Sequence, residues 1–164
     1  MIRRETWTPK GKAATDVVLQ TFRANGLFLA GGDVLAAAEG LTAARWQVLG
    51  AVALAGRPLT VPQIARRMGL TRQAVQASVN RLLGEALVEA AGNPDHRRSP
   101  IIRTTELGGE KYAAIQRRQV AWINDLAAGL KRSELETTAR VLQQLGNRLD
   151  TSREGDDHET PRDG

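Results

Sequence analysis

The chain has 164 residues, of which 41% are hydrophobic and 25% are charged, and its formal net charge is +5. This length suits one domain with helical extensions, and the absence of cysteine excludes disulfides, cysteine-ligated metals and thiol-based redox sensing. The positive charge favours a polyanionic partner. Apolar runs are shorter than the roughly 20 residues that span a bilayer, which argues against a membrane partner and, with a polar N-terminal start, predicts a cytoplasmic protein.

The N-terminal part predicts a flexible arm followed by a long helix. Residues 1–10 are polar, and apolar residues then recur three or four apart over residues 13–39, which is helical spacing. We assign residues 11–40 to this N-terminal helix. A second helix begins after Thr42, which is a suitable N-cap, and it ends at Gly56.

Two shorter helices follow. In the first, over residues 59–69, Thr60 and Gln63 match a capping box, and Gly69 can take the left-handed conformation that ends a helix. Thr71 is the expected N-cap of the next helix. The apolar face of that helix consists of Val75, Val79, Leu82 and Leu83. Two short helices around a glycine-containing turn are typical of a helix-turn-helix.

The C-terminal part predicts two long helices and a tail. The first helix begins near Thr105, and the second begins at Ser133, which matches a capping box with Glu136. The second helix carries leucines at heptad-like spacing, and we assign residues 105–150 to this helical region. Residues 151–164 contain no aliphatic side chain and predict a disordered acidic tail.

A β-hairpin separates the helix-turn-helix from these last helices. Residues 87–91 and 101–104 predict two strands joined by a turn-rich, basic segment. A helix-turn-helix followed by such a hairpin is the layout of a winged helix, here over residues 41–104. Long helices outside that lobe must bury their apolar faces, and a second copy of the chain is the simplest partner. We therefore expect a mainly α fold with a small β-hairpin wing, flanked by helices that form a dimerisation region.

The helix over residues 71–83 carries a polar face opposite its apolar face. Gln and Asn pair with adenine and Arg with guanine in the major groove, while arginines also contact phosphates. Residues 57–83 contain five arginines and no acid, which indicates a phosphate-binding surface rather than an ordinary solvated face. Arginines at a wing tip can enter a narrow minor groove. The candidate DNA-binding residues are Arg57, Thr71, Arg72, Gln73, Gln76, Asn80, Arg81, Arg97 and Arg98.

Three stretches of the sequence resemble the MarR family of transcriptional regulators. They are residues 41–49, residues 59–75 and residues 93–99, and the last leads to the motif Thr105-x-x-Gly108. The flanking helices fit as well, so the resemblance extends over roughly residues 13–149. It implies a homodimer on a pseudo-palindromic double-stranded DNA operator, with repression as the commonest outcome.

The resemblance also assigns roles to particular residues. It makes residues 71–83 the recognition helix and Arg98 the wing arginine, with Arg97 beside it. The family usually has Asp two residues before that arginine, whereas this chain has His96 there and Asp95 one step earlier. The geometry of the wing is therefore less firmly implied than its identity.

A ligand pocket is a further implication of the resemblance. Family members often bind small aromatic or anionic molecules between the dimer helices and the DNA-binding lobe. This would place Phe28, Arg45 and Trp46 near a pocket. The alternative is that Phe28 and Trp46 are simply part of the core.

The leading hypothesis is a sequence-specific, ligand-responsive DNA-binding regulator. One alternative is an architectural or silencing DNA-binding protein without small-molecule input, and another is a winged-helix module that binds proteins. The sequence has no glycine-rich phosphate loop, no set of nucleophile, histidine and carboxylate, and no metal-ligand spacing. It therefore predicts neither catalytic residues nor a cofactor or metal site.

Overall fold

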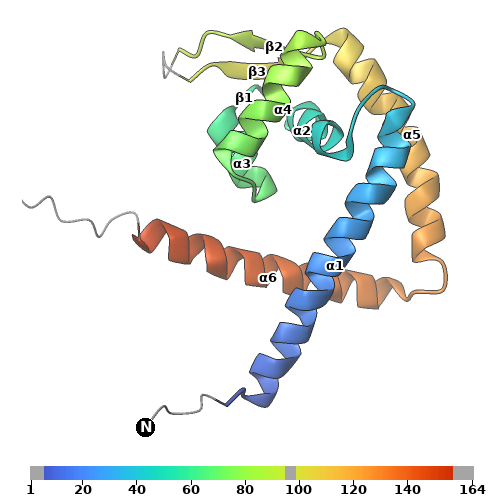
Figure 1. Cartoon of the computed structure of the whole chain (residues 1–164), viewed down its shortest axis with the longest axis vertical. Helices are drawn as coiled ribbons and strands as arrows, with labels where there is room; N and C mark the ends of the chain where they lie inside the picture. Colours follow the sequence, from blue (N-terminus) through green and yellow to red (C-terminus); the bar gives the residue numbers. More distant parts are fainter. Residues whose placement is uncertain (1–5, 95–98, 157–164) are drawn as a thin grey trace, which may run out of the picture. The chain divides into compact units, whose positions relative to one another are not determined.

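The computed structural model describes residues 6–94 and 99–156, which are mainly helical with one small sheet (Figure 1). The elements are α1 (Pro9–Ala37), α2 (Ala43–Ala53), β1 (Leu59–Thr60), α3 (Val61–Met68), α4 (Arg72–Gly84), β2 (Val88–Ala91), β3 (Ile101–Thr104), α5 (Glu106–Ala127) and α6 (Arg132–Asp156). The chain forms two compact units, Met1–Ala121 and Trp122–Gly164. The expected mainly α fold with a small β wing is confirmed.

Threonine side chains begin each of the three helices α2, α3 and α4, as predicted. Thr42 and Thr71 accept hydrogen bonds from backbone N–H groups of the first turns of α2 and α4. At α3 the capping box is complete, because Thr60 N donates to Gln63 Oε1 at 2.9 Å and Gln63 N donates to Thr60 Oγ1 at 3.4 Å. Such a cap is worth about 1 kcal/mol. Gly69 ends α3 with a φ of 64°, which directs the chain into α4.

The sheet has three antiparallel strands in the order β1-β3-β2. Val88 of β2 pairs with Thr104 of β3, which confirms the predicted hairpin within a residue. On its other edge β3 pairs with β1, where Leu59 lies opposite Ile102. Strand β1 was not predicted, because it has only two residues and exists only through its pairing with β3.

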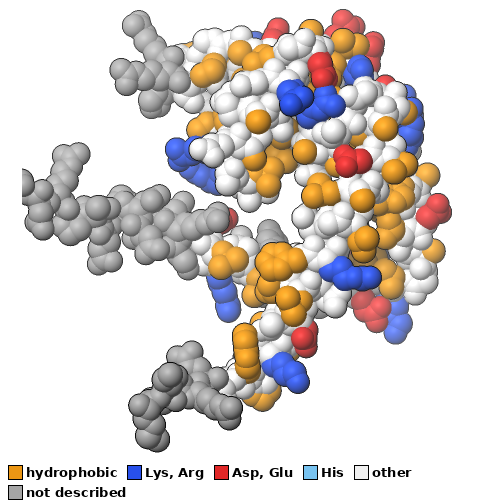
Figure 2. Space-filling model, in the orientation of Figure 1, with side chains coloured by type: hydrophobic (Ala, Val, Ile, Leu, Met, Phe, Trp, Pro, Cys, Tyr) orange, Lys and Arg blue, Asp and Glu red, His pale blue; other side chains and the backbone are white. Residues whose placement is uncertain are grey.

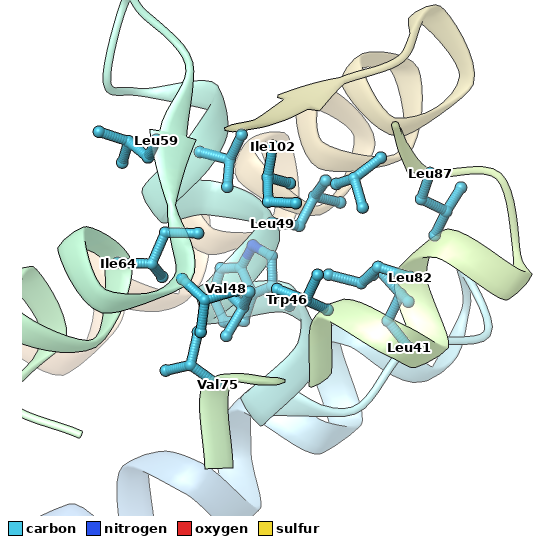
Figure 3. Packing of buried hydrophobic residues seen from close by; sticks show 14 of the residues in the cluster. Leu41, Trp46, Val48, Leu49, Leu59, Ile64, Val75, Leu82, Leu87 and Ile102 are labelled. Carbon is cyan, nitrogen blue, oxygen red and sulfur yellow. The ribbon is translucent and has the colours of Figure 1, made fainter. Parts of the chain in front are cut away.

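The core of residues 41–104, here called the winged lobe, lies between α2, α3, α4 and the sheet (Figure 3). Val75, Val79 and Leu82 of α4 are completely buried, and Leu83 is partly buried at the edge of the core. They meet apolar residues of α2, among them Leu49, which is also completely buried. The burial of each such side chain stabilises the folded state by roughly 1.5–3 kcal/mol. The predicted apolar face of α4 is confirmed.

The start of α5 is joined closely to the end of the winged lobe. Thr105 accepts a hydrogen bond from Gly108 N at 3.0 Å and donates one to Ala86 O at 2.8 Å. A Cβ atom at Gly108 would lie 1.9 Å from the carbonyl oxygen of Leu87. No side chain fits there, so the glycine allows α5 to begin against the backbone that precedes β2.

Farther along, α5 contributes to the same core. Ile115 is completely buried. The ring of Tyr112 lies against Gly50 of α2, where an added Cβ would come within 2.9 Å of it. Burial raises the pKa of the Tyr112 hydroxyl above its ordinary value of 10.0.

Helix α1 begins at Pro9, where Thr8 is the N-cap and accepts a hydrogen bond from Gly11 N at 2.9 Å. The predicted arm over residues 1–10 was therefore too long at its C-terminal end, and residues 1–5 lie outside the described residues. Hydrophobic side chains are exposed along α1 (Figure 2). They are Val18, Leu19, Phe22, Leu27, Phe28 and Val34.

In the second unit, α6 begins one residue before the predicted N-cap Ser133. The backbone N–H of Lys131 lies 3.4 Å from Glu134 Oε2, so the acid that caps this end is Glu134. Glu136, the predicted capping acid, instead accepts a hydrogen bond from Arg132 Nε at 2.7 Å. The capping-box prediction at this helix was wrong, because the helix begins one residue earlier and Glu134, three residues after Lys131, takes the capping position.

The C-terminal end of α6 also differs from the prediction. The helix continues to Asp156, so residues 151–156 are helical rather than part of a disordered tail. Residues 157–164 lie outside the described residues. Three leucines of the predicted stripe are exposed, namely Leu135, Leu142 and Leu149. An amphipathic helix with an exposed apolar stripe lacks a partner for that stripe.

Candidate nucleic-acid interface

Helix α4 is oriented by its apolar face, which leaves a polar face directed to solvent. Because Val75, Val79 and Leu82 point into the core, the residues on the far side of the helix cannot be buried by the same lobe. The exposed polar residues of α4 are Arg72, Gln73, Gln76, Asn80 and Arg81, together with the N-cap Thr71. All the predicted recognition-helix residues are therefore brought together on one exposed surface.

The polar groups of this face are largely available for new hydrogen bonds. Thr71 Oγ1 is engaged as the N-cap, because it accepts from Ala74 N at 3.2 Å. Gln76 Nε2 donates to Asn80 Oδ1 at 2.8 Å, one turn farther along the helix. This bond orients the two amides, and among the described residues it leaves the Gln76 oxygen and the Asn80 NH₂ group available to pair with a base edge.

A groove of about 390 Å³ runs between α4 and the base of the wing. On the α4 side it is lined by Arg72, Gln73 and Gln76, and on the wing side by Ser99 and Pro100. Ser99 and Pro100 were not among the predicted DNA-binding residues, since their proximity to α4 depends on how β3 packs. The groove places recognition-helix side chains and the wing along one continuous surface.

The five arginines between residues 57 and 83 have no acidic partner within the described residues. They are Arg57, Arg66, Arg67, Arg72 and Arg81, and all of them are exposed. Arg57 lines a second hollow, of about 530 Å³, together with Arg103 of β3. Arg103 was not predicted, because a lone strand arginine carries no motif. Exposed cations without internal partners suit a polyanionic ligand.

The wing tip contains two predicted contacts that the structure does not describe. Arg97 and Arg98 lie outside the described residues, as do Asp95 and His96. At the base of the tip, Asn93 Nδ2 donates to Ser99 O at 2.9 Å. The roles of the two arginines stay predictions.

The three predicted ligand-binding residues are not equivalent. Trp46 is only 8% exposed and belongs to the core, where its ring lies against Gly32. Phe28 is half-exposed on α1. Arg45 pairs with Glu85. Neither of the two hollows described above is lined by any of them.

Within residues 6–94 and 99–150, no group of three or more His, Asp or Glu side chains is placed to hold a metal ion. In that same part of the chain, no helix is long and apolar enough to cross a membrane. The polar face of α4 is thus the best-defined candidate site.

The element order and this surface define a winged helix-turn-helix. Residues 39–99 match the family model described as the MarR family. The uncharacterized protein Rv2011c of Mycobacterium tuberculosis is 43% identical over 129 residues, which cover 79% of this chain and 89% of that protein. The chain belongs to the MarR family.

Solved structures of MarR regulators have the same fold. The MarR/EmrR family transcriptional regulator from Acinetobacter sp. ADP1 is similar with a TM-score of 0.74 at 19% identity, covering 84% of this chain and 97% of that one. CouR from Rhodococcus jostii RHA1, solved with p-coumaroyl-CoA, gives 0.72 at 21% identity over 81% and 93%. MarR from Staphylococcus aureus, in complex with salicylate and kanamycin, gives 0.68 at 13% identity over 85% and 94%.

Proposed function

We propose that the chain is a sequence-specific double-stranded DNA-binding regulator that acts as a homodimer on a pseudo-palindromic operator and represses transcription. One observation carries this proposal. Helix α4 presents two arginines, two glutamines and an asparagine on a single exposed face, at the position of the recognition helix. These side chain types make bidentate contacts with guanine and adenine in the major groove.

Charge supports DNA as the partner rather than a protein. The five arginines between residues 57 and 83 are exposed, and no acidic residue occurs in that segment. Phosphate contacts position a protein on the duplex, while base contacts select the sequence. The arrangement of arginines around an amide-rich face fits that division, with Arg97 and Arg98 as proposed wing contacts.

The apolar surfaces of α1 and α6 support a homodimer. Phe22 and Val34 of α1 are 70% and 78% exposed, and Leu149 of α6 is 68% exposed. Large exposed apolar side chains that recur along a helix mark an interaction surface. We assign residues 11–40 and 105–150 to dimerisation, because two-fold symmetry then matches an inverted repeat in DNA.

Release by a small aromatic or anionic ligand is the finer part of the proposal. The structural relatives CouR and Staphylococcus aureus MarR were solved with p-coumaroyl-CoA and with salicylate. In this chain Phe28 is the most accessible of the proposed pocket residues. Trp46 is buried and Arg45 is paired with Glu85. In the proposed pocket, these two residues would therefore line the wall.

The test is a selection of bound duplexes from a random DNA pool at physiological salt. The proposal predicts enrichment of an inverted repeat with half-sites about one helical turn, roughly 34–36 Å, apart. Binding without enrichment would instead indicate an architectural or silencing protein. If no duplex is retained, a winged-helix module for protein partners replaces the proposal.

A further inference from the structure

The turn between α1 and α2 is held by side chains from neighbouring helices. Asp33 Oδ1 of α1 accepts a hydrogen bond from Ala43 N, at the start of α2, at 2.6 Å. From α5, Lys111 Nζ donates to Glu39 O at 2.6 Å, and Arg118 Nη1 lies 2.9 Å from Glu39 Oε1. Helices α1, α2 and α5 therefore meet at one polar joint.

Arg45 extends this joint to the recognition helix. Its guanidinium pairs with the carboxylate of Glu85, the C-cap residue of α4, and also donates to Gly40 O at 3.0 Å. Gly40 belongs to the turn after α1 and has a φ of 75°. One side chain thus connects the end of α4 to the turn that α1 and α5 hold.

The residues that follow Glu85 are also tied to α5. Thr105 Oγ1 donates to Ala86 O at 2.8 Å, and Thr105 N donates to Leu87 O at 3.2 Å. Ala86 has a φ of 53°, in the left-handed region that non-glycine residues rarely adopt. A residue in that conformation persists only where its surroundings hold it. The end of α4 is therefore fixed from both α2 and α5.

The presence of an acid at this point is not explained by the helix itself. The C-terminal end of a helix carries partial negative charge, so a carboxylate there is disfavoured. The pair is also partly solvated, with the Arg45 and Glu85 side chains 16% and 42% exposed, and such pairs add little to stability. The Arg45–Glu85 pair is therefore explained neither by the helix dipole nor by a large gain in stability. A role in positioning α4 does explain it.

We propose that Arg45 and Glu85 are positioning residues that fix the angle of the recognition helix α4 relative to α1 and α5. The inference rests on the proposed homodimer, in which α1 and α5 hold the second protomer. The angle then sets the distance between the two recognition helices, and with it the half-site spacing that the dimer accepts.

Spin labels can measure this angle without DNA. The chain contains no cysteine, so Ala74→Cys, on the exposed N-terminal turn of α4, places one label in each protomer. From Glu85 to this label the helix is about 16 Å long, so a pivot of about 15° moves each label by about 4 Å. Pulsed dipolar spectroscopy of the full-length protein then reports the distance between the two recognition helices.

Glu85→Gln removes the charge and keeps the size of the side chain. In this variant we expect the distance distribution to broaden or shift by up to about 8 Å, because both labels move, while the melting temperature stays close to that of the parent. The double variant Arg45→Glu with Glu85→Arg should narrow the distribution again. Glu89→Gln is the matched control, because Glu89 is also an exposed glutamate but lies on β2 outside this joint.

The possible results of the distance measurement lead to different conclusions. An unchanged distribution in Glu85→Gln overturns the positioning role and leaves the proposed DNA-binding function intact. The absence of any dipolar signal in the parent shows that no dimer forms, which removes the homodimer and this inference together. As a second measurement, duplexes selected by Glu85→Gln should contain the same half-sites at more than one spacing, whereas duplexes selected by Glu89→Gln should keep the parental spacing.

Discussion

The winged lobe and helix α1 differ in the burial of their apolar side chains. In the lobe, Leu82 and Val75 are completely buried, and the polar residues of α4 take the solvent side. On α1, Phe22 and Val34 remain mostly exposed although they are as apolar as the core residues. The apolar residues of the lobe are buried within the lobe itself. The apolar residues of α1 remain exposed among the described residues of a single chain.

This contrast separates two functions within one chain. A lobe with its own hydrophobic core can present the polar face of α4 to DNA without help from a second chain. A helix with exposed apolar residues needs a second surface, and in the proposed homodimer a second copy supplies one with the symmetry that a pseudo-palindrome requires. Substitutions in the two regions should therefore alter different measurements.

The largest effect is expected where α5 joins the lobe. Gly108→Ala would place a Cβ 1.9 Å from the Leu87 carbonyl oxygen, so the backbone of one element must move. We expect a loss of about 3 kcal/mol or more in the free energy of unfolding, measured by urea denaturation. A variant as stable as the parent would mean that α5 does not begin against the backbone of Leu87.

The dimer surface should respond next. Replacing Phe22 and Val34 together by serine should weaken dimerisation by about 2 kcal/mol, or roughly 30-fold in Kd, as measured by analytical ultracentrifugation. Leu54→Ser serves as the control, because Leu54 is 62% exposed but lies at the end of α2 in the lobe. Equal dissociation of both variants would contradict the assignment of α1 to the dimer.

Within the lobe, Gln73→Ala should relax the preference for one base pair in each half-site by about 1–3 kcal/mol. Arg98→Ala should instead weaken binding with little change in base preference, since a minor-groove arginine responds mainly to groove shape and potential. Competition titrations with point-substituted operators distinguish the two. Equal losses on specific and random duplexes in both variants would rule out base readout by α4.

The smallest effect is expected one residue from the largest. A Cβ at Gly109 meets no atom within 4 Å, and the position lies inside α5. Gly109→Ala should therefore stabilise the protein by up to about 1 kcal/mol through helix propensity. Comparison of Gly109→Ala with Gly108→Ala tests whether close packing or helix propensity determines stability at the start of α5. A destabilised Gly109→Ala would show that Gly109 is packed more tightly than described.

The parts of the fold that were predictable depend on residues close together in sequence. Thr60 and Gln63 form the predicted capping box, Gly69 takes the predicted left-handed conformation, and Thr71 caps the recognition helix. Such signals are local, because each involves a hydrogen bond or a dihedral angle within one turn. The same holds for the apolar and polar faces of α4.

The parts that were missed depend on distant pairing or on where a helix begins. Strand β1 forms only because Leu59 meets Ile102 across the sheet. The pair of Arg45 with Glu85 likewise joins two helices that no motif connects, although an acid at the end of a predicted helix was a visible anomaly. At α6 only Glu136 was predicted as the capping acid, whereas the helix begins one residue earlier and Glu134 meets the backbone N–H of Lys131.

One measurement can test whether α4 binds DNA while the long helices α1 and α6 do not. Hydrogen exchange of the full-length protein, with and without the duplex enriched from the random pool, reports which backbone segments DNA protects. The account predicts added protection in α4 and at the base of the wing, with little change over residues 9–37. Protection confined to α1 or α6, with none in α4, would contradict the assignment of the DNA-binding surface.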